Sequence, residues 1–406
     1  MSDTATGALP VIEAAVLDDD PFSPEMLANP QVFQERLREA GPVAYLSRYG
    51  VYAVGRYQEV RQSLSNWQDL ISGRGVGLLD ADEIRGGILQ LDPPQHDAPR
   101  EVLQAVMSAR VLKAMTDDCR QLAESLVDTL SERRDSRGDV AVDGYADIAK
   151  VFPINFFPTA AGIDEDGREN LLPYADHNFN CVGPRNELTR QGEAGAAERF
   201  EWAVRKCQRD ALKPQGFGAD IWAAVDRGDL LPEQAPSIVI TQLNAGVDTT
   251  VYGIAGLLYA LATHPDQWAL LRADPRLARV AFEEAIRWES PVQFLFRKAA
   301  NDIDFSGVTV PAGSRLLIAF GAANRDPRRW ADPDRFDLTR DPSGHLAFGM
   351  GIHQCVGQHA ARLQAEVLLQ VLAERVRTMQ VTGPLGRHHN NALRGWGSIP
   401  LTWHLA

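Results

Sequence analysis

Cysteine is scarce in this sequence, and its few cysteines form no pattern. None belongs to a C-x-x-C pair or to a cluster with histidine; they are Cys119, Cys181, Cys207 and Cys355. Such usage excludes a disulfide framework and a structural zinc site, and it favours a reducing compartment. The first twenty residues also lack a basic stretch followed by an apolar run, so no signal peptide is predicted. We therefore expect a cytoplasmic protein in which residues 1–20 form a flexible or loosely docked tail.

Positive charge is in deficit. Lys and Arg number 41 against 54 Asp and Glu, which gives a formal net charge of −13. Because binding to nucleic acid or to an anionic membrane depends on an excess of basic residues, we expect neither as a nonspecific partner. The sequence also lacks a Ser/Gly-rich linker, a charge block and an internal repeat, so a single domain is predicted over residues 21–406.

Long apolar runs are absent except over residues 237–262, where Asp248 is the one ionisable residue. About 20 apolar residues suffice to cross a bilayer, so the length alone would permit a membrane span. Polar residues gathered at its centre argue against that interpretation: Gln242, Asn244, Asp248, Thr249 and Thr250. The pattern predicts instead a buried helix that crosses the whole molecule.

The middle of this run combines small residues with an acid and two alcohols. A threonine hydroxyl can bond back to a preceding carbonyl, and Gly246 leaves room beside the backbone. The composition therefore predicts a polar notch in an apolar helix. A kink without function is the alternative, and the adjacent acid and alcohol, Asp248 and Thr249, make it the weaker of the two.

A single cysteine follows two glycines in the segment from Phe348 to Gly357, just before a helical pattern over residues 360–376. Glycine permits backbone angles that turn consecutive N–H groups toward one atom, and a helix N-terminus lowers the pKa of a thiol. The segment predicts that Cys355 is a thiolate able to ligate a metal from one side. The alternative is a small buried hydrophobe, which is the common role of a lone cysteine.

Other local patterns are weaker. His96 and Arg100, and likewise Glu284 and Arg287, share a helical face by their spacing, which alone is typical of surface contacts. The glycine-rich stretch at residues 71–79 is either a surface loop or a mobile flap that carries Arg74. Periodicity predicts helices at residues 30–40, 57–65, 111–130, 146–162 and 171–201, the last broken at Gly183-Pro184. It also predicts a hairpin from residues 43–46 and 51–54, two strands within 304–320 joined by a turn at 311–314, and short strands after residue 381.

The order Phe348, Gly349, His353, Cys355, Gly357 resembles the haem-ligand loop of the cytochrome P450 family. Asp248-Thr249 matches the acid-alcohol pair of that family, and Glu284-x-x-Arg287 matches its E-x-x-R motif. The motifs occur in the family's order, and the resemblance covers about residues 21–401. It implies a mainly α fold with small β-sheets, in which haem b lies between the long helix and the Cys355 loop.

The resemblance also implies roles for individual residues. Cys355 would be the metal ligand, Asp248 and Thr249 the catalytic pair, and Glu284 with Arg287 a structural pair. Haem contacts would come from His96, Arg100, Ala245, Gly246, Thr249, Arg297, Phe348, Gly349, His353 and Gly357. The implied reaction is a monooxygenation that uses O2 and two electrons.

The sequence contains no flavin or iron–sulfur signature. The resemblance therefore implies a separate ferredoxin or flavodoxin with its reductase, docking on the Cys355 side of a monomer. Arg328, Arg329 and Arg362 are candidate contacts, with ordinary surface charges as the alternative for each.

Three segments, at residues 72–78, 183–188 and 324–330, look like a bacterial branch of the family that binds para-substituted benzoates and demethylates 4-methoxybenzoate. A small aromatic carboxylic acid needs an apolar slot for its ring and polar groups for its carboxylate. We expect the slot from Phe179, Val182 and Leu295, and the donors from Arg74, Thr241 and Asn244. Val182 stands where that branch tends to carry phenylalanine. Phe179 and Val182 could equally be core residues.

Two other functions compete. A peroxide-driven haem-thiolate peroxygenase often replaces the acid-alcohol pair with Arg-Pro, and the pair here opposes it. A non-enzymatic haem sensor or carrier would need neither proton-delivery residues nor a substrate pocket.

Overall fold

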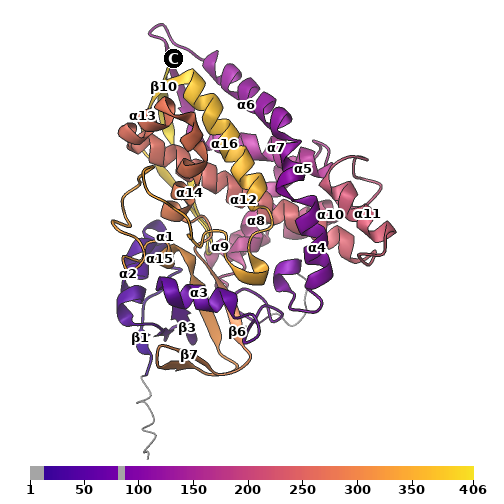
Figure 1. The fold of residues 1–406 in the computed structure, drawn as a ribbon, viewed down its shortest axis with the longest axis vertical. Helices are drawn as coiled ribbons and strands as arrows, with labels where there is room; N and C mark the ends of the chain where they lie inside the picture. The colour runs from indigo at the N-terminus through magenta and orange to yellow at the C-terminus, as the bar shows by residue number, and fades with distance from the viewer. Residues whose placement is uncertain (1–12, 81–86) are drawn as a thin grey trace, which may run out of the picture.

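One long helix organises the computed structural model, which describes residues 13–80 and 87–406 (Figure 1). This helix, α12 (Gln234–Thr263), has 30 residues and packs against α7 (Val151–Ala161), α8 (Leu171–Asn180) and α14 (Ala278–Glu289). By length and composition alone α12 could cross a membrane, but 78% of its apolar window is buried inside the protein. The predicted buried helix at 237–262 is confirmed and is slightly longer than expected.

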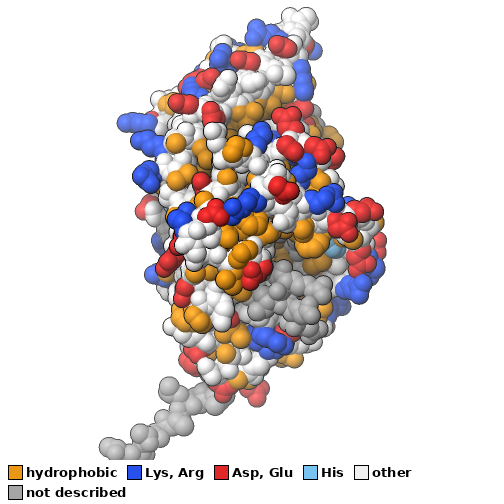
Figure 2. Space-filling model, turned by 90° about the vertical axis from the view of Figure 1, so that its right-hand side faces the viewer, with side chains coloured by type: hydrophobic (Ala, Val, Ile, Leu, Met, Phe, Trp, Pro, Cys, Tyr) orange, Lys and Arg blue, Asp and Glu red, His pale blue; other side chains and the backbone are white. Residues whose placement is uncertain are grey.

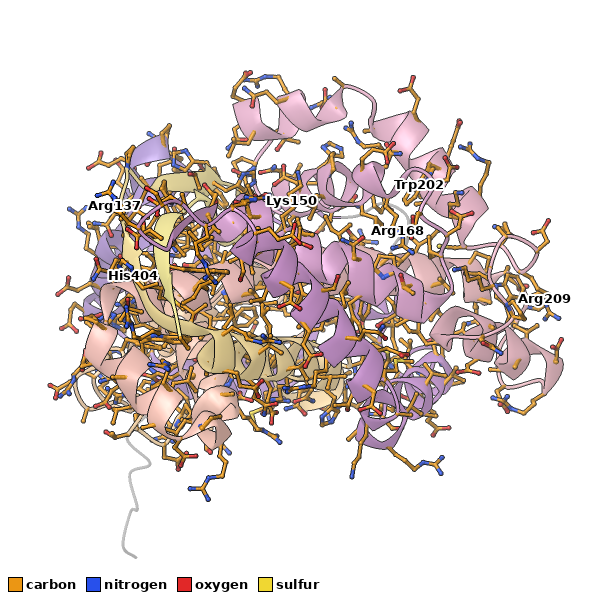
Figure 3. All side chains as sticks on the ribbon, turned by 90° about the horizontal axis from the view of Figure 1, so that it is seen from above. Arg137, Lys150, Arg168, Trp202, Arg209 and His404 are labelled. Carbon is orange, nitrogen blue, oxygen red and sulfur yellow. The ribbon has the colours of Figure 1, made fainter. Side chains whose placement is uncertain are left out.

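α12 joins the two largest hydrophobic clusters. Its C-terminal half, with Ile254 and Leu258, packs against residues of α14, α6 (Thr116–Ser131) and α16 (Gln358–Arg375). Its N-terminal half, with Val239 and Leu243, packs against residues of α4 (Asp97–Val106), α10 (Ala196–Lys206) and α11 (Phe217–Asp226). Figure 3 shows the two ends of the molecule: Trp202 and Arg209 lie near α10 and α11, and Arg137 and His404 lie at the opposite end.

The other helices follow most of the predicted ranges. They are α1 (Pro24–Ala28), α2 (Pro30–Ala40), α3 (Tyr57–Ser65), α4 (Asp97–Val106), α5 (Ala109–Lys113), α6 (Thr116–Ser131), α9 (Glu187–Glu193), α10 (Ala196–Lys206), α11 (Phe217–Asp226), α13 (Pro265–Ala273), α15 (Phe320–Ala323) and α16 (Gln358–Arg375). The predictions at 30–40 and 57–65 are confirmed with the same bounds. The helix predicted at 146–162 is a π-helical turn, Gly144–Ala149, followed by α7. The range 171–201 contains α8, α9 and most of α10, with the predicted break around Gly183-Pro184.

Strands gather mainly in one six-stranded sheet with the order β1-β2-β3-β9-β6-β4. Its members are β1 (Ala15–Leu17), β2 (Ala44–Leu46), β3 (Val51–Val54), β9 (Arg315–Ala319), β6 (Phe294–Ala299) and β4 (Leu70–Ile71). The β2–β3 hairpin is confirmed as an antiparallel pair, while β3 runs parallel to β9. Two smaller sheets pair β7 (Ile303–Phe305) with β8 (Val308–Val310) and β11 (Gly386–His389) with β12 (Arg394–Ser398). In a third, β13 (Pro400–Leu405) lies between β10 (Val376–Val381) and β5 (Asp139–Asp143) and pairs with both. The turn at 311–314 therefore joins β8 and β9, which belong to different sheets.

The expected N-terminal tail does not extend to Asp20. Residues 15–17 form β1, which pairs in parallel with β2, and Asp20 lies 2.8 Å from Arg48 in an ion pair. Backbone pairing and charge thus dock this segment on the sheet, although its sequence has no strong strand pattern. The first twelve residues of the predicted tail lie outside the described residues.

Candidate functional site

The loop that carries Cys355 has the backbone that its glycines predict. Gly349 and Gly351 have φ angles of +65° and +72°, in the left-handed region that favours glycine. A Cβ atom on Gly351 would also collide with the carbonyl oxygen of Leu64. The N–H of Cys355 donates to the carbonyl of Phe348 at 2.8 Å, which closes the loop just before α16. Gly357 has an ordinary φ of −79° and serves as the N-cap of α16.

The thiol of Cys355 has its pKa raised, contrary to the expected lowering. Burial is the largest cause and favours the neutral form. The backbone N–H groups of Gly357 and Gln358 and the charges of Arg100 and Arg362 act in the predicted direction but do not outweigh burial. A bound metal ion changes this balance, because a coordinating thiol is deprotonated outright.

Basic groups converge beside this loop. The rings of His96 and His353 meet edge to face with centroids 4.9 Å apart, and the Nε2 atom of each is buried without a hydrogen-bond partner among the described residues. Burial, with the charges of Arg297, His96 and Arg100, lowers the pKa of His353 to about 3. Arg297 on β6 is 5% exposed and donates to the backbone carbonyl of Phe296, and burial lowers its pKa to about 10.

A buried group of donors with unused N–H positions is suited to an anion. The haem implied by the sequence carries two propionates, and His96, Arg100, Arg297 and His353 offer them donors. Arg100 already donates to the carbonyl of Gln354 at 2.6 Å, so it also fixes the Cys355 loop. The residues present therefore fit the group.

The middle of α12 is open on one side. Ala245 is exposed and Thr249 is half-buried, although the residues around them on the helix are mostly buried. The Thr249 hydroxyl donates to the carbonyl of Ala245 at 2.7 Å, and Thr250 donates to that of Gly246 at 2.8 Å. These bonds confirm the predicted back-bonding of the threonines, and the open side leaves room for a flat cofactor next to Ala245.

Gly246 does not supply this room. A Cβ atom at Gly246 would lie 2.5 Å from Cε1 of Phe157, so the absent side chain allows α7 to pack closely on α12. The notch interpretation was therefore wrong about which residue makes the space. The reason is that consecutive helical residues point about 100° apart, so Ala245 and Gly246 face different neighbours.

Asp248 is 1% exposed, and neither carboxyl oxygen has a hydrogen-bond partner among the described residues. Burial, with the charge of Asp176, raises its pKa well above the usual range. Burial thus favours the neutral carboxylic acid, which is the form that can donate a proton.

The three predicted slot residues come together. Val182 belongs to a cluster against which Phe179 and Leu295 pack as partly buried side chains. The amide of Asn178 on α8 donates to Oδ1 of Asn244 at 3.3 Å, while the Thr241 hydroxyl donates to the carbonyl of Ser237. Arg74 is an exposed residue, and its backbone carbonyl accepts a hydrogen bond from Arg315 at 2.8 Å.

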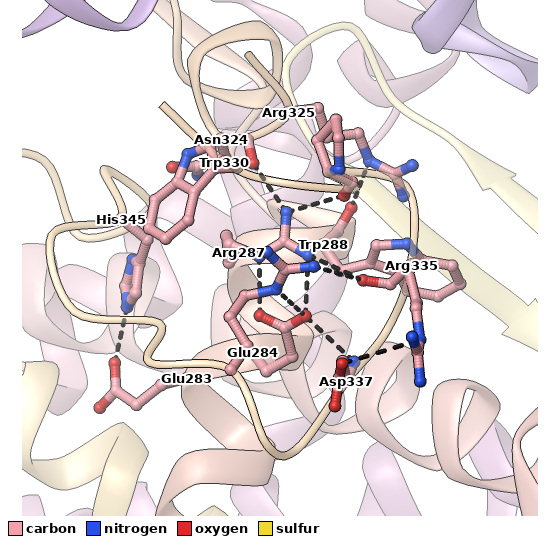
Figure 4. Close-up of polar contacts among 12 residues, drawn as sticks. Glu283, Glu284, Arg287, Trp288, Asn324, Arg325, Trp330, Arg335, Asp337 and His345 are labelled. Carbon is pink, nitrogen blue, oxygen red and sulfur yellow. Dashed lines mark hydrogen bonds and ion pairs between the residues drawn. The ribbon is translucent and has the colours of Figure 1, made fainter. Parts of the chain in front are cut away.

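The Glu284–Arg287 pair is fully buried (Figure 4). Two hydrogen bonds of 2.7 and 2.8 Å join the guanidinium to the carboxylate. Arg287 also donates to the carbonyls of Asn324, Pro333 and Arg335, which belong to the long segment leading to the Cys355 loop. The pair fastens this segment to α14.

Sequence reasoning missed the polar groups around Asp248 and beneath Phe348. Asp176 binds His388 at 2.6 Å, and His388 stacks on Tyr252. Glu283 binds both His345 and Arg362, and the Arg362 guanidinium lies 4.6 Å from the Phe348 ring centroid. No local motif marks these residues, because each contact joins distant segments.

Comparisons with known proteins agree with this geometry. The family model described as Cytochrome P450 matches residues 223–377. The chain is 47% identical to cytochrome P450 CYP199A2 of Rhodopseudomonas palustris, over 94% of this chain and 93% of that one. It is 30% identical to the cytochrome P450 monooxygenase PikC of Streptomyces venezuelae, over 98% and 95% of the two chains.

Solved structures agree as well. The crystal structure of CYP108D1 from Novosphingobium aromaticivorans superposes with a TM-score of 0.81 at 26% identity, covering 93% of this chain and 95% of that one. The fold, the cysteine loop and nearly full-length similarity to known members lead to one conclusion: the chain belongs to the cytochrome P450 family, whose members bind haem.

Proposed function

We propose that this cytochrome P450 monooxygenase hydroxylates or O-demethylates a small aromatic carboxylic acid, with 4-methoxybenzoate or a related 4-alkoxybenzoate as its substrate. The observation that carries the proposal is the hydrogen bond from Asn178 to Asn244, because Asn178 directly precedes Phe179 on α8, and Phe179 packs with Leu295 against the cluster that contains Val182. An apolar slot with a few polar groups at one end suits a flat ring that carries a carboxylate.

The sequence analysis predicts Arg74 as a donor to the bound carboxylate, and the proposal gives it a role at the surface. Its exposed position supports a role in attracting the anion at the surface, while Asn178, Asn244 and Thr241 supply donors inside. Val182 is smaller than the phenylalanine of the resembled branch, so the slot is wider at this point and accepts alkoxy groups longer than methoxy.

Haem bound through the Cys355 thiolate supplies the oxidising chemistry, because the thiolate donates electron density and favours cleavage of the O–O bond of dioxygen. His96, Arg100, Arg297 and His353 would hold its propionates, and Ala245 would leave room for its ring. Asp248 holds a proton on a buried carboxyl oxygen. The Thr249 hydroxyl, bonded to the Ala245 carbonyl, keeps its lone pairs toward the open side of α12 and can accept a hydrogen bond there.

The net reaction consumes one substrate, one O2, two electrons and two protons. Oxygen inserted into a methoxy C–H bond gives a hemiacetal, which collapses to the phenol and formaldehyde, while the second oxygen atom leaves as water. The protein contributes positioning of the ring and ordered delivery of the two protons.

Cytochromes P450 of this kind use separate redox partners, and we propose a ferredoxin or flavodoxin with its reductase. Acidic and basic side chains are interspersed on the face shown in Figure 2. The three arginines suggested for docking have partners within the chain: Arg362 binds Glu283, Arg328 binds Asp326 and Glu39, and Arg329 lies over Trp330. Their positions support structural roles more than docking.

Spectral titration tests the substrate. We expect 4-methoxybenzoate to shift the Soret band of the haem protein, and methoxybenzene, which lacks the carboxylate, to shift it far more weakly. Asn244→Leu should weaken binding of the acid by roughly ten- to a hundredfold, since one lost hydrogen bond to a charged group costs about 1.5–3 kcal/mol. A Soret band that does not move at high concentrations of 4-methoxybenzoate contradicts the proposal. Formation of 4-hydroxybenzoate with an electron source, and not with peroxide alone, separates monooxygenase from peroxygenase and sensor.

A further inference from the structure

The glycine-rich stretch at residues 72–79, here called the glycine loop, is held by one buried arginine. Arg315 is the first residue of β9, and its side chain is 6% exposed. Its Nη1 donates to the carbonyl of Gly75 at 2.8 Å, and its Nη2 donates to the carbonyls of Arg74, at 2.8 Å, and Leu79. One guanidinium thus joins two parts of the loop that are separated along the chain.

The beginning of the glycine loop is fixed by an acid. The N–H groups of Ser72 and Gly73 donate to the two carboxylate oxygens of Asp92 at 2.9 and 2.8 Å. The N–H of Gly75 donates to the carbonyl of Ser72 at 2.8 Å, in a turn where Gly75 has a φ angle of +88°. Glycine adopts this left-handed conformation without steric cost. The path of the loop therefore depends on its own glycines and on two side chains outside it.

Two main-chain hydrogen bonds join the glycine loop to the predicted substrate slot. The N–H of Leu78 donates to the carbonyl of Val182 at 2.8 Å. The N–H of Phe296 donates to the carbonyl of Val76 at 2.9 Å, and Phe296 follows Leu295 on β6. The loop therefore contacts the backbone at or beside two of the three slot residues, Val182 and Leu295.

Packing between the glycine loop and the segment after α8 is close. A Cβ atom at Gly77 would lie 3.1 Å from the carbonyl oxygen of Val182 and 3.3 Å from its Cα, which is tighter than ordinary contact. Leu78 and Val182 belong to one buried cluster, and Phe179 and Leu295 pack against it. A displacement of the loop would therefore change the space around all three slot residues.

We propose that Arg315 is a positioning residue for substrate selection: by holding the glycine loop against Val182, it sets the width of the slot and thus the length of the alkoxy group that fits. The inference rests on the proposed function, because the slot is the one assigned there to the benzoate. Arg315 acts through the backbone of the loop, since its Nη donors are directed at main-chain carbonyls. A fixed apolar wall can discriminate about 10–200-fold between groups that differ by one methylene.

A neighbouring lysine separates the charge of Arg315 from its hydrogen bonds. Asp80 lies 3.1 Å from Nε of Arg315 and also accepts from the ammonium of Lys298 at 2.8 Å. Lys298 is the cross-strand partner of Arg315 in the β6–β9 pair, but it donates to no carbonyl within the described loop at 72–79. Lys298→Met is therefore a matched control, because it removes the same charge from beside the same acid and leaves the bonds from Arg315 to the loop in place.

Spectral titration of the haem protein with 4-methoxybenzoate and 4-butoxybenzoate measures the selection. Arg315→Met loses every donor, so the wall loosens, the short group loses contact and the long group fills the added space. We expect binding of 4-methoxybenzoate to weaken about tenfold relative to 4-butoxybenzoate, at the lower end of what one methylene is worth in an apolar pocket. Arg315→Lys keeps the charge without the planar fork and should lie between Arg315→Met and the wild type.

The control decides the outcome of this titration. Lys298→Met should keep the wild-type ratio of the two dissociation constants. An Arg315→Met protein with the same ratio as Lys298→Met overturns the proposal. Should Arg315→Met not fold, the ratio in Arg315→Lys decides in the same way, because this variant keeps the charge beside Asp80.

Hydrogen exchange gives a readout that needs no substrate. The Leu78 amide, which donates to Val182, should exchange several-fold faster in Arg315→Met than in Lys298→Met, while amides of the β10–β13 pair exchange as in the wild type. The second group separates a local release of the loop from a general loss of stability. Equal exchange of Leu78 in the two variants overturns the proposal. A wild-type protein that binds neither benzoate refutes the proposed function instead, and the exchange measurement still decides whether Arg315 holds the loop against Val182.

Discussion

Removing Arg287 is expected to lower the free energy of unfolding by about 3–5 kcal/mol, the usual cost of breaking a buried ion pair by deleting one partner. Neither Glu284 nor Arg287 has exposed side-chain surface, so Arg287→Ala leaves a carboxylate without solvent. The same change leaves carbonyls of Asn324 and Pro333 without the donor that each now has at 2.9 Å. An unsatisfied buried acceptor costs about 1–3 kcal/mol, in the same direction.

The measurement is urea unfolding of the holoprotein at a fixed concentration of added haem, because a ligand that binds only the folded state adds its own stabilisation. Arg190→Ala is a matched control: Glu187 and Arg190 have the same types and spacing as the buried pair, but their side chains are 66% and 55% exposed. This control should unfold like the wild type. Arg287→Lys keeps the charge and loses the forked donor geometry, so it should fall between the two. If Arg287→Ala were no less stable than Arg190→Ala, the pair would not hold the segment before the Cys355 loop.

Three further predictions concern other parts of the site. Thr249→Ala should consume electrons at nearly the wild-type rate while diverting them to peroxide; unchanged coupling of electrons to product would remove Thr249 from the mechanism. Arg297→Leu should speed the transfer of haem to an acceptor protein several-fold, because a buried charged donor to a propionate is lost; an unchanged transfer rate would exclude that contact. For Glu289, burial acts to raise the pKa, but the charges of Arg394 and Arg387 outweigh it and lower the value to about 2. The carboxylate therefore stabilises the fold above its ordinary pKa near 4.5 and loses this effect as pH falls toward 2, so the urea midpoint of Glu289→Gln should be lower at pH 7 and depend less on pH across that window.

Local sequence patterns predicted the elements that depend on local interactions. α2 and α3 have their predicted bounds, and the β2–β3 hairpin forms where alternating apolar residues flank a turn. The cysteine loop was also predictable, because positive φ angles at Gly349 and Gly351 are a property of those residues themselves. Similarity to a family added the haem and the order of the motifs.

Contacts between distant segments could not be predicted in this way. Asp176 and His388 are 212 positions apart, and neither stands in a recognisable motif. The pairing of β1 with β2 depends on tertiary context, since residues 15–17 carry little strand signal. The predicted direction of the Cys355 pKa shift was wrong for a related reason. Hydrogen bonds from neighbouring residues can be predicted from the sequence, whereas the burial that outweighs them depends on the whole fold.

The acid Asp248 and the alcohol Thr249 have different surroundings because they face different sides of α12. Thr249 lies one turn after Ala245, on the open side, whereas Asp248 is buried one turn before Tyr252, whose ring contacts His388 of β11 and lies against Gly395 of β12. Adjacent residues on a helix point about 100° apart, so one short motif can face the cofactor space and the buried interior at once. Similarity in the motif therefore predicts the acid and the alcohol, but not what surrounds each of them. Those surroundings include residues of α8 and β11, and they have to be identified from the three-dimensional structure of each chain.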